Sequence, residues 1–488
     1  MRTLLDSIEA WASASVDPLE IDRTHDIGSA LLEDLVQFGL FGASIPEAYG
    51  GSELSLTQIC EIVGGLARID RSIATTVGLH LGLGTRAFVA FGSDEQKSTL
   101  LPLLASGEWI AAFAATEAGA GSDLSAIRTK AVQDGETLVL NGEKVFVTNG
   151  GLADIFTVLV STPGLGGARR GHSLIWLHAD DAGLSLGAEE HKLGLRGSST
   201  RSIYLDDVRL GLDRVVGEPG MGMHHAHQVL AWGRTVMAAG CVGAAAEALG
   251  RTLAHVRERR QFGKPLSALA VVREQLADMS ALQFAMEAIV QCTAADEEDW
   301  EALARRSTSA KVFCSDGDWK IADLAIQLHG GSGFIEETGL PLLLRDARIT
   351  RIFEGANDVL QTRIGATEAV GSPRIPLMDR WGNDPLALGA DVHAVAVTAL
   401  RQGMVNAHGA RLLRDKRLLH RLGSAVVLRE ATDAAASRAL DLGTPGARAH
   451  AEHWQTLAGK ELAALHRAPS PTPPIDAILH SRFVGDFR

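Results

Sequence analysis

The residue whose type and neighbours most suggest chemistry is Glu354, which lies between an apolar pair and Gly355. A carboxylate held against apolar side chains has its charged form disfavoured, so its pKa rises toward neutral pH, as a general base requires. Gly355 would allow a ligand to approach the backbone closely. The alternative is an ordinary ion pair with Arg345, Arg348 or Arg351, and for an isolated glutamate near a turn this is the more common arrangement.

Two segments could bind a flat cofactor. Residues 116–123 read Thr-Glu-Ala-Gly-Ala-Gly-Ser-Asp, and glycines with flanking hydroxyls at the end of a strand expose backbone N–H groups and small donors. Phe146 and Thr148 are two apart in a β-favouring run, so they share one face, where a ring and a hydroxyl could flank a ring-shaped cofactor. Each segment also has a plain alternative, a surface turn for the first and a half-buried strand for the second.

Two further segments suit phosphate groups. Residues 258–266 end a helical pattern with Arg259 and Arg260, whose guanidinium groups could clamp phosphates, although cations are also favoured at any helix C-terminus. Residues 327–334 read Gln-Leu-His-Gly-Gly-Ser-Gly-Phe. A helix C-cap explains one glycine of this run but not three, so the backbone there could approach a phosphate or a sugar.

The elements that must position these residues change in character along the chain. Apolar spacing is helical from Asp26 to about residue 112, with Ser93 or Asp94 expected to cap one helix, and short β-favouring runs follow, among them 137–141 and 144–148. Long helical segments then return near 226–258, 267–295 and 301–329, which indicates a bundle. The predicted class is α+β, with an N-terminal α domain at 1–112, a middle β domain at 113–222, a four-helix-bundle domain at 223–370, and a linker with an additional small helical domain at 371–488.

Length and composition exclude several classes. The chain has 488 residues, too many for a single core, and its four cysteines are scattered, so neither a disulfide framework nor a zinc site is expected. Histidines cluster at 224–227 without an acidic partner at the spacing of a metal site, so no metal is predicted. A net charge of −13 argues against a nucleic-acid binder that works through bulk charge, and a localised basic groove is left as an alternative. No signal core or membrane-length apolar segment is expected, which predicts a cytoplasmic protein.

In this order and spacing, the motifs resemble the acyl-CoA dehydrogenase family of flavoproteins. The likeness covers about 26–369 and is strengthened by phrases such as Pro-Glu-Ala-Tyr-Gly-Gly at 46–51 and Lys-Leu-Gly-Leu-Arg-Gly-Ser-Ser-Thr-Arg at 192–201. The family fold is an α domain, a β domain and an α bundle, in agreement with the pattern above. The resemblance favours the catalytic interpretation of Glu354 over the ion pair.

The resemblance implies FAD-dependent α,β-dehydrogenation of an acyl-CoA thioester to the trans-2-enoyl thioester, in fatty acid metabolism. Glu354 would abstract the α-proton while flavin N5 takes the β-hydride. The substrate would contact Ser122, Arg234 and Gly355. The implied cofactor-binding residues, some of them acting across a subunit boundary, are Phe113, Ala115, Thr116, Gly121, Ser122, Phe146, Thr148, Arg259, Gln261, Phe262, Gln327, Gly330, Gly331, Asn357 and Asp358.

Several positions depart from the family pattern. Phe146 stands where many members have Trp, and the other departures are to alanine, at positions 118, 231, 270 and 356. Ala231 replaces an Asp or Asn that commonly contacts the acyl-CoA. An acyl group tethered to a carrier protein is therefore an alternative substrate. An oxidase that passes electrons to oxygen, and a non-catalytic DNA-associated or assembly flavoprotein of the same fold, are further alternatives.

The C-terminal block at 386–488 resembles a shortened form of the helical appendage of long-chain members. Because that appendage covers a surface used for tetramer formation, a homodimer is predicted, with an electron-transfer flavoprotein as its redox partner. The basic residues of 411–421 could touch a membrane surface, but a solvated helix face is the favoured interpretation.

Overall fold

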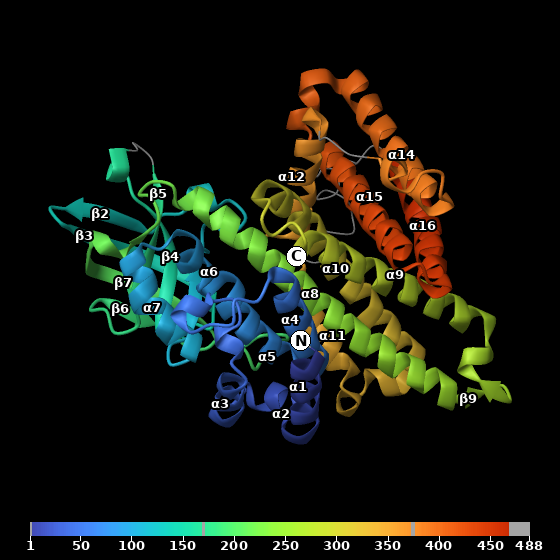
Figure 1. Ribbon diagram of the computed structural model, residues 1–488, viewed down its shortest axis with the longest axis horizontal. Helices are drawn as coiled ribbons and strands as arrows, with labels where there is room; N and C mark the ends of the chain where they lie inside the picture. Colours follow the sequence, from blue (N-terminus) through green and yellow to red (C-terminus); the bar gives the residue numbers. More distant parts are fainter. Residues whose placement is uncertain (1, 168–170, 372–375, 468–488) are drawn as a thin grey trace, which may run out of the picture.

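The structure is a computed structural model that describes residues 2–167, 171–371 and 376–467. It has three consecutive parts and an appendage, seen in Figure 1 as a sheet at the left, long helices at the centre and right, and C-terminal helices above them. The α+β class and the order of its parts are therefore as predicted. Within the predicted 371–488 domain, residues 372–375 and 468–488 lie outside the described residues.

The N-terminal part is helical from Arg2 onward, earlier than the sequence pattern indicated. Ser93 caps α7, since its hydroxyl accepts a hydrogen bond from the backbone N–H of Gln96 at 3.1 Å, and Ser55 caps α4 in the same way. A π-helical turn, His80–Gly84, follows α5. The helices of this part are α1 (Arg2–Ser15), α2 (Pro18–Thr24), α3 (Ser29–Gln37), α4 (Leu56–Ile69), α5 (Arg71–Leu79), α6 (Arg86–Phe91) and α7 (Asp94–Ser106).

The middle part is one mixed sheet of eight strands in the order β6-β7-β3-β2-β4-β5-β8, with β1 added parallel to β4. Two runs that the sequence separated, 137–141 and 144–148, form the single strand β3, whose pairing with β7 shifts register twice. The strands are β1 (Ala111–Ala114), β2 (Lys130–Asp134), β3 (Thr137–Thr148), β4 (Ile155–Ser161), β5 (His172–His178), β6 (Leu184–Leu186), β7 (Thr200–Gly211) and β8 (Val215–Val216).

The bundle is organised around α8, the longest helix, which packs against α4, α9 and α10. Among the described residues α8 alone is long and apolar enough to cross a membrane, with a mean hydropathy of 1.4 in its apolar window, 78% of which is buried inside the protein. The expectation that no segment reaches this length was wrong, because a central helix is apolar on every side. The bundle helices are α8 (Gly222–Glu258), α9 (Ala270–Ala294), α10 (Trp300–His329), α11 (Leu340–Thr350) and α12 (Asn357–Val370).

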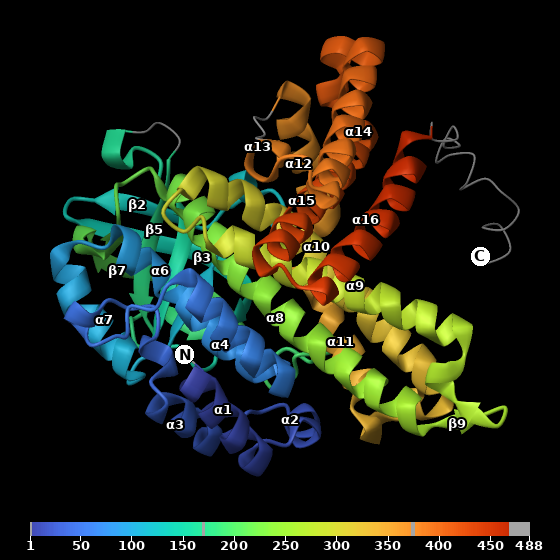
Figure 2. The ribbon, with the colours of Figure 1, turned by 45° about the vertical axis from the view of Figure 1, so that its right-hand side comes forward.

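The appendage lies on α9, α10 and α12 (Figures 1 and 2). Its basic segment is divided, since a 3₁₀ turn ends at Arg414 and α15 begins at Lys416, with Asp415 as its cap. It is therefore not one continuous amphipathic helix. The described helices of the appendage are α13 (Met378–Trp381), α14 (Pro385–His408), α15 (Lys416–Leu442) and α16 (Pro445–His466).

Two glycines allow α12 and α15 to cross at close range. A Cβ on Gly365 would lie 1.8 Å from the backbone oxygen of Leu419, and one on Gly423 would lie 1.8 Å from that of Gln361. A buried ion pair between Arg429 and Glu368, 3.2 Å apart, joins the same two helices. The appendage is therefore closely packed against the helix that follows the candidate base.

Gly423→Ala is expected to lower the free energy of unfolding by about 3 kcal/mol, because the added methyl group must push two packed backbones apart. Gly403→Ala in α14 is the matched control, since its Cβ meets nothing within 4 Å, and it is expected to raise stability slightly. Thermal unfolding of both variants checks this difference. Equal midpoints for the two variants would show that α12 and α15 are not tightly packed.

Candidate active site

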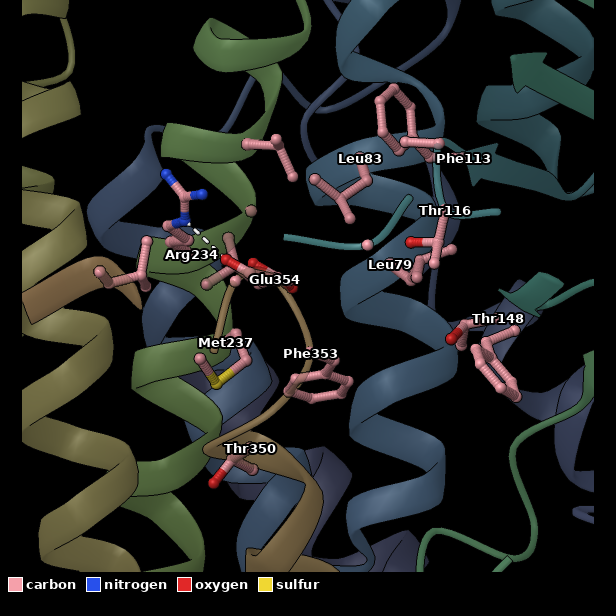
Figure 3. Close-up of a pocket in the computed structure, with 18 of the residues that line it drawn as sticks. Leu79, Leu83, Phe113, Thr116, Thr148, Arg234, Met237, Thr350, Phe353 and Glu354 are labelled. Atoms are coloured by element: carbon pink, nitrogen blue, oxygen red, sulfur yellow. Dashed lines mark hydrogen bonds between the residues drawn. The ribbon is translucent and has the colours of Figure 1, made fainter. Parts of the chain in front are cut away.

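Glu354 lies in a short loop between α11 and α12 that faces a cavity of about 460 Å³. The cavity runs between α5 and α8 and reaches the ends of β1 and β3 (Figure 3). A Cβ on Gly233 of α8 would lie 2.2 Å from the Leu83 Cδ2 and 3.6 Å from the Glu354 carboxylate oxygen Oε2. Glycine at this position therefore lets Leu83 pack against α8, beside the carboxylate.

The backbone of the loop is strained where the carboxylate is presented. Glu354 has φ +54° and Gly355 has φ +100°, and a left-handed conformation is unfavourable for a residue such as glutamate. The Arg234 Nε donates a hydrogen bond to the Glu354 backbone oxygen at 2.9 Å, as the dashed line in Figure 3 shows. This contact fixes the loop against α8.

The ion-pair alternative for Glu354 is not what the structure shows. Arg345 pairs with Asp22 at 2.7 Å, Arg351 pairs with Asp316 at 2.6 Å, and Arg348 lies over the Trp319 ring. The Glu354 Oε2 is buried and has no hydrogen-bond partner in the described part of the chain. This carboxylate oxygen is therefore not engaged by another described residue and can interact with a ligand in the cavity.

The electrostatic environment gives Glu354 a pKa suited to a base. Burial raises the pKa of its carboxyl to about 7, while the positive charges of Arg234 and Lys311 lower it in part. Burial also lowers the pKa of Arg234 to about 10, against the effect of Glu354. Near neutral pH both forms of the carboxyl are thus accessible, as proton transfer requires.

Lys311 supports the loop from beneath and was not identified from the sequence. This side chain of α10 is fully buried, and its Nζ donates to the Gly355 oxygen at 2.7 Å and to the Asn357 Oδ1 at 2.8 Å. Burial lowers the pKa of Lys311 to about 8, although Glu354 acts in the opposite direction. A lysine in a helix that carries several other charged residues forms no motif, so only its burial reveals the role.

The opposite wall of the cavity suits a flat aromatic cofactor. Phe146 is 65% exposed, in a left-handed conformation with φ +57°, so its ring is left open toward the cavity. The side-chain hydroxyls of Thr116, Ser122 and Thr148 line the same cavity and make no hydrogen bond to other described residues. An open ring with unpaired hydroxyls beside it fits a flavin and the edge of its ring system.

A buried ion pair holds this wall in place. The Glu117 carboxylate accepts hydrogen bonds from the Lys144 Nζ at 2.8 Å and from the backbone N–H groups of Arg128 and Thr129. Burial alone would raise the pKa of Glu117, but these bonds keep it below its usual value. Lys144 also donates to the Ala115 oxygen, so the glycine loop and β3 are joined next to Phe146.

Most of the predicted site residues fall into two groups in the structure. The cavity brings together Phe113, Ala115, Thr116, Gly121, Ser122, Phe146, Thr148, Arg234, Glu354 and Gly355. The other group lies exposed at the far end of α8 and α10, where the hairpin of β9 (Arg260–Gln261) and β10 (Lys264–Pro265) projects (Figure 1). That group consists of Arg259, Gln261, Phe262, Gln327, Gly330 and Gly331.

Asn357 and Asp358 do not line the cavity. Asn357 is buried between Lys311, Ser315 and Asp316, and the Asp358 side chain is 92% exposed, 3.4 Å from His420. Their assignment to the cofactor, like that of the exposed group, stays a prediction. Asn357 has a structural role, because its side chain links the start of α12, next to the loop that carries Glu354, to α10.

A helical domain, a mixed sheet and a helical bundle that share a cavity of this kind define a flavin-binding enzyme class. Three family models match the chain, described as the N-terminal, middle and C-terminal domains of acyl-CoA dehydrogenase, over residues 1–108, 112–208 and 220–369. The chain belongs to the acyl-CoA dehydrogenase family, whose cofactor is FAD.

Individual relatives agree with this assignment. A probable acyl-CoA dehydrogenase, FadE25, of Mycobacterium tuberculosis is 35% identical over 72% of this chain and 91% of its own length. The very long-chain specific acyl-CoA dehydrogenase of mouse mitochondria is 35% identical over 74% of this chain, but the match spans only 56% of the mouse protein. An acyl-CoA dehydrogenase of Bacillus anthracis, solved in complex with FAD, has a TM-score of 0.86 at 29% identity and covers 95% of this chain and 87% of its own.

Proposed function

We propose that this protein is an FAD-dependent dehydrogenase that introduces a trans-α,β double bond into an acyl-CoA thioester. The observation that carries the proposal is the unpaired Glu354 carboxylate, with a pKa near neutrality, in the same cavity as the open Phe146 ring. Removal of a proton and a hydride from adjacent carbons requires a base and a flat redox cofactor on the same cavity, and this cavity has the base and a site for such a cofactor.

In this mechanism the chain binds, orients and takes the proton. The backbone N–H of Glu354 makes no hydrogen bond to other described residues, so it can donate to the thioester carbonyl and stabilise the charge that develops on deprotonation. The Glu354 carboxylate then removes the α-proton. Arg234 and Lys311 keep the loop in position through the oxygens of Glu354 and Gly355.

The residues around Phe146 fit the flavin, and the exposed group at the far end of α8 and α10 would hold the ADP half. FAD, when bound, supplies the acceptor for the hydride from the β-carbon. Apolar side chains such as Leu79, Leu83 and Phe353 line the cavity and exclude water from the reacting atoms.

The rate of substrate-dependent flavin reduction is expected to rise with pH through about pH 7. Glu354 must be ionised to accept a proton, and burial has raised its pKa to about 7, so the active form is lost on acidification. Well below that pH, kcat/KM should fall about tenfold per pH unit. Stopped-flow measurements from pH 5.5 to 9 test this; a flat profile would contradict a buried base.

The experiment that tests the function is anaerobic bleaching of the flavin by a panel of CoA thioesters of different chain length and branching. Reduction by at least one thioester supports the proposal, and absence of bleaching by all CoA and carrier-protein thioesters contradicts it. Reduction by carrier-protein thioesters alone would select the biosynthetic alternative, which Ala231 on α8 keeps open. Peroxide release in air would indicate an oxidase, whereas transfer to an electron-transfer flavoprotein supports a dehydrogenase.

We also propose a homodimer. Phe262 is 88% exposed and Phe334 is 82% exposed, and both lie with the exposed cofactor residues at one end of the bundle. Large aromatic side chains left open in this way suit an interface between copies of the chain. Sedimentation showing one tetrameric species would contradict the proposal.

A further inference from the structure

The end of the cavity furthest from the sheet carries polar side chains among apolar ones such as Val63 and Met237. Along α8 the lining passes from Gly233, beside the base, to Cys241, which is eight positions or about 12 Å further on at about 1.5 Å per residue. Figure 3 shows Met237 and Thr350 on this side of Glu354, opposite Leu83 and Phe113. Burial raises the pKa of the Cys241 thiol to about 12, and the polar groups acting on it include Arg71 and Thr350. An acyl chain that enters beside Glu354 therefore ends among polar groups.

Arg71, the first residue of α5, presents unused hydrogen-bond donors there. Its side chain is 4% exposed, and its Nη2 donates to the Asp318 Oδ2 at 2.6 Å in a buried ion pair. The Nε and Nη1 of the same guanidinium have no partner in the described residues. Buried donors normally find partners, so two unpaired ones on a cavity wall point to a ligand acceptor.

Thr75 adds a second polar group one turn along α5. Its side chain is half-buried on the cavity wall, and its hydroxyl makes no hydrogen bond to other described residues. Residues four apart on a helix lie on the same face, and Thr75 and Arg71 both line the cavity.

The charge balance favours a neutral ligand group. Asp318 already compensates the Arg71 charge, and two further buried acids, Asp70 and Asp346, lie near it. Burial raises the pKa of Asp70 to about 6 and that of Asp346 to about 7, which shows how poorly this region accommodates negative charge. An additional carboxylate would be disfavoured, whereas a hydroxyl, keto or amide oxygen would not.

We propose that Arg71 and Thr75 form a hydrogen-bonding end wall that selects thioesters whose acyl chain carries a neutral oxygen acceptor at its far end. Arg71 also borders a second cavity, of about 180 Å³, so it lies between that space and the acyl cavity. This specificity rests on the proposed dehydrogenase function.

The test compares CoA thioesters of matched length that end in a methyl, a hydroxyl or a carboxylate group, over a series of lengths. At the best length, kcat/KM for the hydroxyl ester is expected to exceed that for the alkyl ester by about tenfold or more. Thr75→Val should reduce this ratio without disturbing the ion pair. The double variant R71L/D318N should abolish it, and it removes both charges because Arg71→Leu alone would leave Asp318 buried and unpaired.

A wild-type preference for alkyl esters, or for carboxylate esters over hydroxyl esters, would overturn the end wall while leaving the dehydrogenase function intact. An unchanged ratio in both variants, with FAD content normal, would do the same. If no thioester reduces the flavin, the proposed function fails, and calorimetry with non-reactive CoA thioethers still decides the end wall. Tenfold tighter binding of the hydroxylated thioether, lost in the double variant, supports it; equal binding of both thioethers refutes it.

Discussion

Glu354→Gln is expected to slow substrate-dependent flavin reduction by about 10³-fold, while the protein still binds FAD with an unchanged absorbance spectrum. Glutamine has nearly the same size and keeps the polar contacts, but it cannot accept the α-proton, and a positioned general base contributes about 10²–10⁴-fold. The pH dependence near pH 7 should also disappear, because the group that titrates there has been removed. Anaerobic stopped-flow absorbance measures both effects.

Glu136→Gln is the matched control, since Glu136 is exposed in the turn between β2 and β3 and lies outside the cavity. Its rate should equal that of the unmodified protein. Normal bleaching in the Glu354 variant would show that another residue is the base.

Lys311→Met is expected to reduce kcat/KM by about 10²-fold and the free energy of unfolding by about 3 kcal/mol. Both hydrogen bonds from its Nζ are charge-assisted, and losing them leaves the Gly355 oxygen and the base loop unsupported. A displacement of about 1 Å in the position of a base can cost about two orders of magnitude in rate. Because the lysine charge lowers the pKa of Glu354, its removal should also move the rise in rate to higher pH.

That shift in the pH profile distinguishes an electrostatic effect of Lys311 on Glu354 from a loss of protein stability alone. Lys320→Met on the same helix is the control, since the Lys320 side chain is 58% exposed and pairs with Glu461 at the surface. It should change neither rate nor pH profile. A Lys311 variant that is less stable but keeps the original profile would show that Lys311 has no electrostatic effect on the base.

The division of the fold could be predicted because each part has its own spacing of apolar residues. The long helices were recognised within a few residues, and one of the two expected caps, Ser93, precedes α7. The sequence could not show that β3 is one strand, since its bulges lie between residues of ordinary β pattern. The expectation that no apolar segment reaches the length of a membrane span also failed, because α8 is a central helix whose long apolar window is mostly buried inside the protein.

The site residues that belong to recognisable sequence motifs could be predicted. Local sequence offered Glu354, Phe146 and Thr148 beside plainer alternatives, and the family resemblance favoured their functional interpretation. The structure gathers the three residues around one cavity. Simple strand alternation did not foresee that Phe146 would adopt a left-handed backbone at a bulge. Lys311 and Arg71 could not be found, because a buried charge is recognisable only when its three-dimensional neighbours are known.

The crossing of α12 and α15 has a consequence for how the sequence can evolve. Gly365 and Gly423 touch each other's helix backbones, and Glu368 and Arg429 share a buried bond, so a change in one helix is tolerated only with a compensating change in the other. Since α12 begins two residues after Gly355, this covariation extends to the neighbourhood of the base. Transplanting the appendage onto a shorter relative would therefore require the α12 half of the contact to be transferred with it.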